Sequence, residues 1–176
     1  SEVEKIVREV EKLLEELRED NRDLVRRADK DLERMERHNR KLVKDVEDVL
    51  RRIEEVRRAN TEDKRELEKE VRRVLKEVAD MAKRNEEEIK KVLDKVTRHS
   101  EDNVRKIREI LEDVRRKLED KDLLREIERK IREVEEKSRE LLREIKKKLE
   151  DVARESRRLL EEIARKIEKL SDELRK

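Results

Sequence analysis

The sequence predicts an all-α protein: a long, nearly straight up-down-up three-helix bundle with coiled-coil-like packing. Three observations favour this fold class. They are a composition dominated by charged helix formers, apolar residues in steps of three and four with a longer repeat of 18, and two short polar breaks. We expect a single domain over residues 1–176, with helices at about 3–59, 62–118 and 122–175.

The composition narrows the class of protein. Charged residues make up 60% of the chain and hydrophobic residues 32%, and Gly, Pro, Cys and aromatic residues are absent. Such an excess of Glu, Lys, Arg and Leu in a helical pattern is typical of coiled coils and long helices. The 54 basic and 52 acidic residues leave a net charge of only +2, which argues against a nucleic-acid-binding face. No apolar run approaches the ~18 residues that a membrane span needs, and no signal-peptide core is present, so we expect a soluble protein.

The apolar residues of the first predicted helix follow two periods at once. Steps of three and four residues place them on one face of a helix. The longer repeat relates three sets of positions: Val10, Ala28 and Val46; Leu14, Leu32 and Leu50; and Leu17, Met35 and Ile53. Eighteen residues make about five turns at 3.6 residues per turn, so this repeat predicts nearly straight helices without supercoiling.

Two polar breaks divide the chain into three helices. Residues 60–63, Asn-Thr-Glu-Asp, indicate a helix end followed by an N-cap and an acidic first turn. In residues 119–122, Glu-Asp-Lys-Asp, either aspartate could cap the next helix. Ser1 and Glu4 form a possible capping box at the start of the chain. At 1.5 Å per residue, each helix would be roughly 80–85 Å long.

Six polar residues interrupt the apolar core line, two in each predicted helix, and the two members of each pair are separated by the same repeat. Reflecting the chain about the two predicted turns brings these residues to common levels of an antiparallel bundle. The sequence therefore predicts two polar layers, each with one residue from every helix. The layers are Asn21, Asn103 and Ser138, and Asn39, Asn85 and Ser156.

Such layers would fix how the helices pair. A buried amide or hydroxyl without a partner costs ~1–3 kcal/mol, whereas two amides and one hydroxyl can largely satisfy one another. Sliding one helix by a turn would bring the amides against leucines, so a buried Asn is a well-attested device for setting register. The alternative is that some of these residues face outward at the edge of the core, above all Ser138 and Ser156.

The histidines suggest a metal site, but their spacing does not support one. His38 and His99 are predicted to lie roughly 20 Å apart along the bundle, too far for one coordination sphere. His99 lies one turn before Asn103, so we expect it to be partly buried and neutral, with a lowered pKa. His38 is expected at the boundary between the core and the solvent-exposed surface. His99, His38 and Ser100 are possible additional members of the polar networks.

No residue pattern indicates an active site. The many carboxylates alternate with Lys and Arg at helical spacings, as expected of solvated faces. The sequence has no nucleophile elbow, no Gly-rich phosphate loop and no aromatic residue for base stacking. We expect no catalytic residue, no cofactor, no metal ligand, no nucleic-acid partner and no membrane contact.

Three features of the whole chain point to a known class of protein. They are the Val/Ile/Leu core without aromatic residues, the regularly repeated layers, and the serine-bearing segments EEKSRELLREI and ARESRRLLEEI. In these features the chain resembles computationally designed (de novo) helical bundles with buried hydrogen-bond networks. The resemblance is one of style rather than of a functional motif, and the loops lack the Gly or Pro common in such designs. It implies a structural scaffold without catalytic activity and without a natural localisation, cytoplasmic in an expression host.

An alternative function is a helical interaction module, or a subunit of a designed homo- or hetero-oligomer. In that case another chain, through self-association or partner helices, would complete the core. A monomeric bundle would require no partner. A natural spectrin-like rod fits less well, because such repeats are shorter and usually carry a buried Trp, which this chain lacks.

Overall fold

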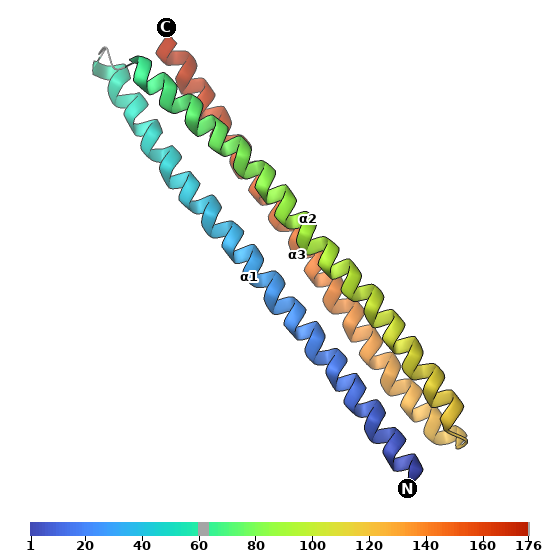
Figure 1. The fold of residues 1–176 in the computed structure, drawn as a ribbon. Helices are drawn as coiled ribbons and strands as arrows, with labels where there is room; N and C mark the ends of the chain where they lie inside the picture. The colour runs from blue at the N-terminus through green and yellow to red at the C-terminus, as the bar shows by residue number, and fades with distance from the viewer. Residues whose placement is uncertain (60–63, 176) are drawn as a thin grey trace. The chain divides into compact units, whose positions relative to one another are not determined.

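The computed structural model describes residues 1–59 and 64–175. These residues form three α-helices, shown in Figure 1: α1 (Glu2–Ala59), α2 (Lys64–Lys117) and α3 (Lys121–Arg175). The three long helices pack against one another, and the described part of the chain contains no strand. The predicted all-α three-helix bundle is therefore confirmed.

The ends of the helices lie close to the predicted positions. The first and third helices each begin one residue earlier than expected, and the second ends at Lys117 instead of residue 118. The predicted start of the second helix at residue 62, with its N-cap, lies outside the described residues.

Side-chain caps explain where two of the helices begin. The Ser1 hydroxyl accepts a hydrogen bond from the backbone N–H of Glu4 at 3.3 Å, and the Glu4 carboxylate lies 3.7 Å from the Ser1 amino group. At the start of α3, the Asp120 carboxylate accepts hydrogen bonds from the backbone N–H groups of Asp122 at 3.1 Å and Leu123 at 3.4 Å. These bonds satisfy N–H groups that have no partner within the helix. Asp120 is thus the N-cap of α3.

The contacts divide the chain into two compact units, each with a segment of all three helices. Unit 1 comprises Ser1–Lys30 and Lys91–Lys148, and unit 2 comprises Asp31–Lys90 and Leu149–Lys176. This division leaves the single-domain assignment a prediction.

Each unit has its own apolar core. The buried residues of unit 1 include one hydrophobic cluster, made up of Val10, Leu14, Leu17, Ile107, Ile110, Val114, Leu118, Ile127, Ile131 and Val134. The buried residues of unit 2 include a second hydrophobic cluster, made up of Leu42, Val46, Val49, Ile53, Leu67, Val71, Val74, Val78, Leu160, Ile163, Ile167 and Leu174. The repeat found in the sequence accounts for the most buried positions of α3, because Ile131, Leu149 and Ile167 are at most 1% exposed.

Ion pairs in unit 1 show that α1 and α3 run parallel. Lys130 on α3 lies 3.5 Å from the Glu11 carboxylate on α1, and Lys148 lies 2.9 Å from that of Asp29. From the first pair to the second, the α1 partner and the α3 partner both advance along the chain by one full repeat.

Ion pairs in unit 2 show that α1 and α2 run antiparallel. Arg34 on α1 lies 2.8 Å from the Glu88 carboxylate on α2, and Arg52 lies 2.5 Å from that of Glu70. From the first pair to the second, the α1 partner advances by one full repeat while the α2 partner retreats by the same interval. The up-down-up order of the helices therefore follows from these contacts.

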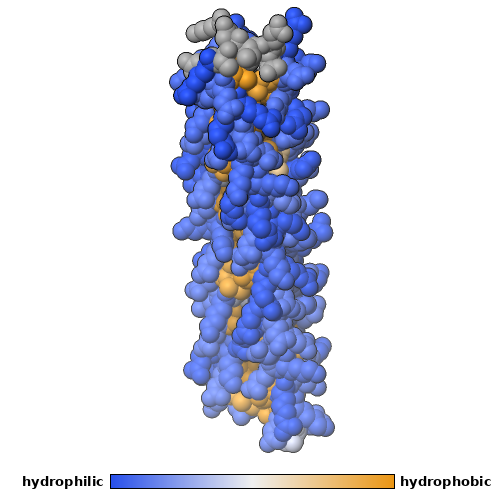
Figure 2. All heavy atoms as spheres, turned by 90° about the vertical axis from the view of Figure 1, so that its left-hand side faces the viewer, coloured by the Kyte–Doolittle hydropathy of each residue, from blue (hydrophilic) through white to orange (hydrophobic). Residues whose placement is uncertain are grey.

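The surface is almost wholly charged. Figure 2 shows hydrophilic side chains over most of the visible face, with apolar residues seen in patches between them. Exposed ion pairs of this kind contribute only ~0–1 kcal/mol each, so the cores rather than the pairs hold the helices together. No helix in the described part of the chain is long and apolar enough to cross a membrane.

Candidate functional site

The structure places all six predicted polar residues in the interior. The side chains of Asn21, Asn39, Asn85, Asn103, Ser138 and Ser156 are between 4% and 7% exposed. We call Asn21, Asn103 and Ser138 layer 1, which lies in unit 1, and Asn39, Asn85 and Ser156 layer 2, which lies in unit 2. Neither serine occupies the outward boundary position that was the alternative.

Layer 2 is a closed set of hydrogen bonds among three helices. The Asn85 amide nitrogen on α2 donates to the Asn39 carbonyl oxygen on α1 at 2.8 Å and to the Ser156 hydroxyl on α3 at 2.8 Å. The Asn39 amide nitrogen also donates to the Ser156 hydroxyl, at 2.9 Å. Every pair of the three residues is therefore bonded directly.

Layer 1 is linked through Asn21 and has one additional member, and among the described residues no hydrogen bond joins Asn103 directly to Ser138. The Asn103 amide nitrogen donates to the Asn21 carbonyl oxygen at 2.7 Å, and the Asn21 amide nitrogen donates to the Ser138 hydroxyl at 2.6 Å. The His99 Nε2 atom lies 2.7 Å from the same Asn21 oxygen. Because that oxygen only accepts, His99 donates from Nε2, and its neutral form in this contact is the Nε2-protonated tautomer.

The sequence spacing explains why only layer 1 contains a histidine. One full repeat before His99 on α2, the chain has Met81, a partly buried hydrophobic residue packed against the core of unit 2. The same position thus extends the network in layer 1 and adds apolar contact in layer 2. The prediction that His99 is partly buried agrees with its position in the structure.

The surroundings of His99 favour its neutral form. Burial lowers the pKa of His99 below its ordinary value of 6.5, and Lys106 lowers it further. Asp20 and Asp102 act in the opposite direction, but burial is the largest of these effects. A neutral ring with its Nε2 proton directed at Asn21 fits the hydrogen bond seen in layer 1.

The buried polar atoms are fully accounted for. Among the described residues, no buried side-chain nitrogen or oxygen lacks a hydrogen-bond partner. Since an unsatisfied buried group costs ~1–3 kcal/mol, both layers can be kept in an apolar core without that penalty.

Two of the possible additional members lie apart from the layers. Ser100 is partly buried and His38 is exposed. Among the hydrogen bonds of the described residues, none joins either side chain to layer 1 or layer 2. His38 instead lines an open surface groove with Met81.

Ser171 is a buried polar residue that the sequence analysis missed. Its side chain is 6% exposed, in the last part of α3. A signal was available, because Ser171 lies four residues after Ile167 and three before Leu174, on the buried face of the helix. One full repeat earlier the chain has Ala153 instead of a serine or asparagine, so Ser171 lacks the spacing that identified the other six.

The cavity beside layer 2 is too small for a substrate. A cavity of about 30 Å³ borders layer 2 and is lined by Asn85 and Ser156. That volume suits on the order of one or two water molecules, far below the several hundred Å³ typical of a ligand pocket. Within the described ranges, no group of three His, Asp or Glu side chains could hold a metal ion.

Comparisons with known proteins return no relative. No protein-family model, no curated protein and no solved structure matches the chain.

Proposed function

We propose that the chain is a de novo designed structural scaffold in which layers 1 and 2 set the register and pairing of the three helices. The observation that carries this proposal is the closed hydrogen-bond set of layer 2, which takes one residue from each helix. A slide of one helix by a turn would place apolar side chains against the two amides and leave them without partners, whereas an all-apolar core accepts such slides at little cost.

The design origin is supported by the regularity of the chain. The same repeat recurs in the apolar core, in both polar layers and in the interhelical ion pairs of each unit. In idealised sequences the core, the polar layers and the surface charges all follow the same spacing, as they do in this chain. No catalytic step, cofactor or metal forms part of this proposal.

The test replaces layer 2 as a whole. In the variant Asn39→Leu, Asn85→Leu, Ser156→Ala, the Tm should rise, because buried polar groups give way to apolar ones. The register between the helices should become less uniquely defined. Spin labels at cysteines replacing the exposed residues Lys44 and Lys76, both in unit 2, report it as a distance distribution between α1 and α2. We expect one narrow peak in the parent and a broad or split distribution in the variant.

The matched control changes exposed neighbours on the same three helices: Arg40→Ala, Glu87→Ala and Glu155→Ala. It should keep the narrow peak. If the layer variant fails to fold, or folds with the parent's distance distribution, the layer is not a device for setting register and the proposal fails.

The second candidate function is a helical interaction module or an oligomer subunit. The observation favouring it is exposed apolar surface: Val3, Leu13 and Leu93 are 42%, 43% and 39% exposed. Small-angle X-ray scattering with absolute mass distinguishes the two functions. A particle of 21.7 kDa supports the self-contained scaffold, and twice that mass or more favours the subunit.

A further inference from the structure

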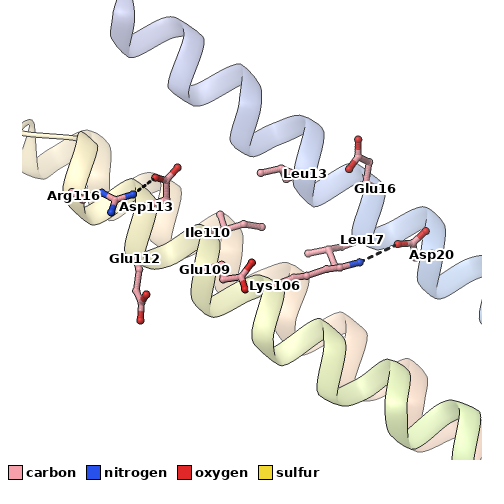
Figure 3. A pocket seen from close by; sticks show the side chains of 10 residues that line it. All are labelled: Leu13, Glu16, Leu17, Asp20, Lys106, Glu109, Ile110, Glu112, Asp113 and Arg116. Atoms are coloured by element: carbon pink, nitrogen blue, oxygen red, sulfur yellow. Dashed lines mark hydrogen bonds and ion pairs between the residues drawn. The ribbon is translucent and has the colours of Figure 1, made fainter.

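A surface groove of unit 1 lies between α1 and α2, outside the polar layers. Its volume is about 590 Å³, and three apolar residues, Leu13, Leu17 and Ile110, lie among its charged lining. Figure 3 shows Leu13 and Leu17 extending from α1 and Ile110 from α2 into the space between the two helices. Leu17 and Ile110 belong to the core of unit 1, whereas Leu13 is 43% exposed.

Leu13 is the exposed apolar member of its set in the repeat of 18 residues. One full repeat later on α1, the chain has Asp31, which forms an ion pair with Arg34 at 3.1 Å. One repeat further along α1, Val49 is buried in the core of unit 2 and is 4% exposed. Leu13 is apolar like Val49, but the core of unit 1 leaves it 43% exposed.

The rim of the groove is acidic, although the whole chain carries a net charge of +2. Five carboxylates line it against two cations. Lys106 pairs with Asp20 at 3.8 Å, and Arg116 pairs with Asp113 at 2.8 Å and holds the pKa of that carboxyl below its usual range. The other three carboxylates, Glu16, Glu109 and Glu112, have no ion pair among the described residues.

The length of the groove matches a short stretch of helix. Its lining runs from Leu13 to Asp20 on α1 and from Lys106 to Arg116 on α2. At 1.5 Å per residue these segments span roughly 10–15 Å, or two to three helical turns. The space between two antiparallel helices accepts a further helix that lays apolar anchors at i, i+3 or i+4 and i+7 into it.

We propose that this groove is a docking surface for a basic amphipathic helix of another protein. The helix places two or three Leu- or Ile-sized residues over Leu13, Leu17 and Ile110, and its flanking Lys or Arg side chains pair with Glu16 and Glu109. Complementary charge selects this occupant. The same groove of a second copy would repel this one, because both rims are acidic.

The probe is a fluorescein-labelled helical peptide of about 14 residues, with leucines at i, i+4 and i+7 and lysines at the flanking positions. A second peptide keeps the leucines and replaces the lysines with glutamates. Anisotropy titration of the full chain should show saturable one-to-one binding of the basic peptide that weakens as salt is added. The acidic peptide should not bind.

Variants locate the bound peptide. Leu13→Asp, which introduces the residue found one full repeat later on α1, should weaken binding by about tenfold or more. Leu93→Asp is the matched control, since Leu93 is an exposed leucine of the same unit outside the groove, and it should bind as the parent does. Glu16→Gln with Glu109→Gln should weaken binding by about threefold and reduce its salt dependence. Circular dichroism checks that each variant folds.

Three outcomes would overturn the proposal. The first is no saturable binding of the basic peptide by the parent chain. The second is equal binding of the acidic peptide, or binding that Leu13→Asp leaves intact, because either places the contact elsewhere. The third is a doubled particle mass that Leu13→Asp returns to 21.7 kDa, which would make a second copy of the chain the occupant.

Discussion

At the scale of single residues, the difference between His99 and Met81 is the most informative feature of the molecule. Both lie on α2, one full repeat apart, beside corresponding polar layers. His99 donates to Asn21 in layer 1, whereas Met81 packs against the core of unit 2. This difference places a titratable side chain in layer 1, whereas layer 2 has none.

The stability of the protein should therefore depend on His99 and pH. Burial holds the folded pKa of His99 below the ordinary value of 6.5, so the unfolded chain takes up a proton more readily than the folded one. The contribution of His99 is fully present above pH 6.5 and is lost as the pH falls through 6.5 toward the folded pKa. Guanidinium unfolding measures the free energy of unfolding at about pH 7.5 and about pH 5. Between these two values it should fall more in the parent than in His99→Met.

The groups facing His99 set the controls for this experiment. Asp20 faces it from α1, and Asp102 and Lys106 from α2 itself, while Ser138 closes the layer from α3. Because the carboxylates titrate in both proteins, only the difference between parent and variant reports His99. His38→Gln is the second control, since the His38 side chain is exposed and outside the layers. Equal pH dependence in the parent and His99→Met would contradict the prediction.

The two layers should also respond differently to loss of their α2 asparagine. Asn85 donates to both other members of layer 2, so Asn85→Ala should lower the free energy of unfolding by about 2–3 kcal/mol. Asn103→Ala should cost about 1 kcal/mol less, because Asn103 donates only to Asn21 and His99 still donates to the same oxygen. Guanidinium titrations at about pH 7.5, where His99 is neutral, measure both. An equal or larger loss in Asn103→Ala would show that His99 does not satisfy the layer.

At the scale of the elements, charged side chains and caps rather than glycines set the ends of the helices. The chain has no Gly or Pro, yet α3 begins at Lys121 because the Asp120 carboxylate accepts two backbone N–H bonds. The sequence allowed either aspartate of the break to be the cap. The choice depends on which backbone N–H groups the carboxylate reaches, and only the folded geometry shows this.

Removing this cap should destabilise the protein by a modest and predictable amount. Asp120→Ala should lower the free energy of unfolding by about 1 kcal/mol, because two N–H groups at the start of α3 lose their acceptor. Asp120→Asn should retain most of the stability, since an amide oxygen also caps. Glu119→Ala is the control at an exposed neighbour and should change stability little. A loss in Glu119→Ala equal to that in Asp120→Ala would show that general charge, not capping, matters here.

At the scale of the whole molecule, two compact units share three continuous helices. Each unit has its own core and its own polar layer, so the contacts by themselves would allow separate unfolding. The helices have no Pro or Gly at the unit boundaries to interrupt their backbone hydrogen bonds. We therefore expect one cooperative unfolding transition, as the single-domain prediction requires.

A core deletion in one unit tests this cooperativity. Ile131 in unit 1 is fully buried, and Ile131→Ala should cost about 2–5 kcal/mol. Amide hydrogen exchange should then show the same loss of protection in the most stable amides of both units. Ile167→Ala is the reciprocal variant, at a fully buried position of the same helix in unit 2. Loss confined to the mutated unit would mean that the chain has two domains.

The sequence by itself determined the helical class, the number of helices and the membership of the two polar layers. It could do so because each depends on spacing: steps of three and four define a helical face, and the shared repeat brings residues such as Asn39, Asn85 and Ser156 to one level. Only the tertiary structure decided which atoms donate and accept, that His99 joins layer 1 while His38 lies outside, and that Ser171 is buried. Periodicity gives the direction of a side chain around its own helix. Hydrogen bonding and burial depend on the neighbouring helices, whose side chains meet it only after packing.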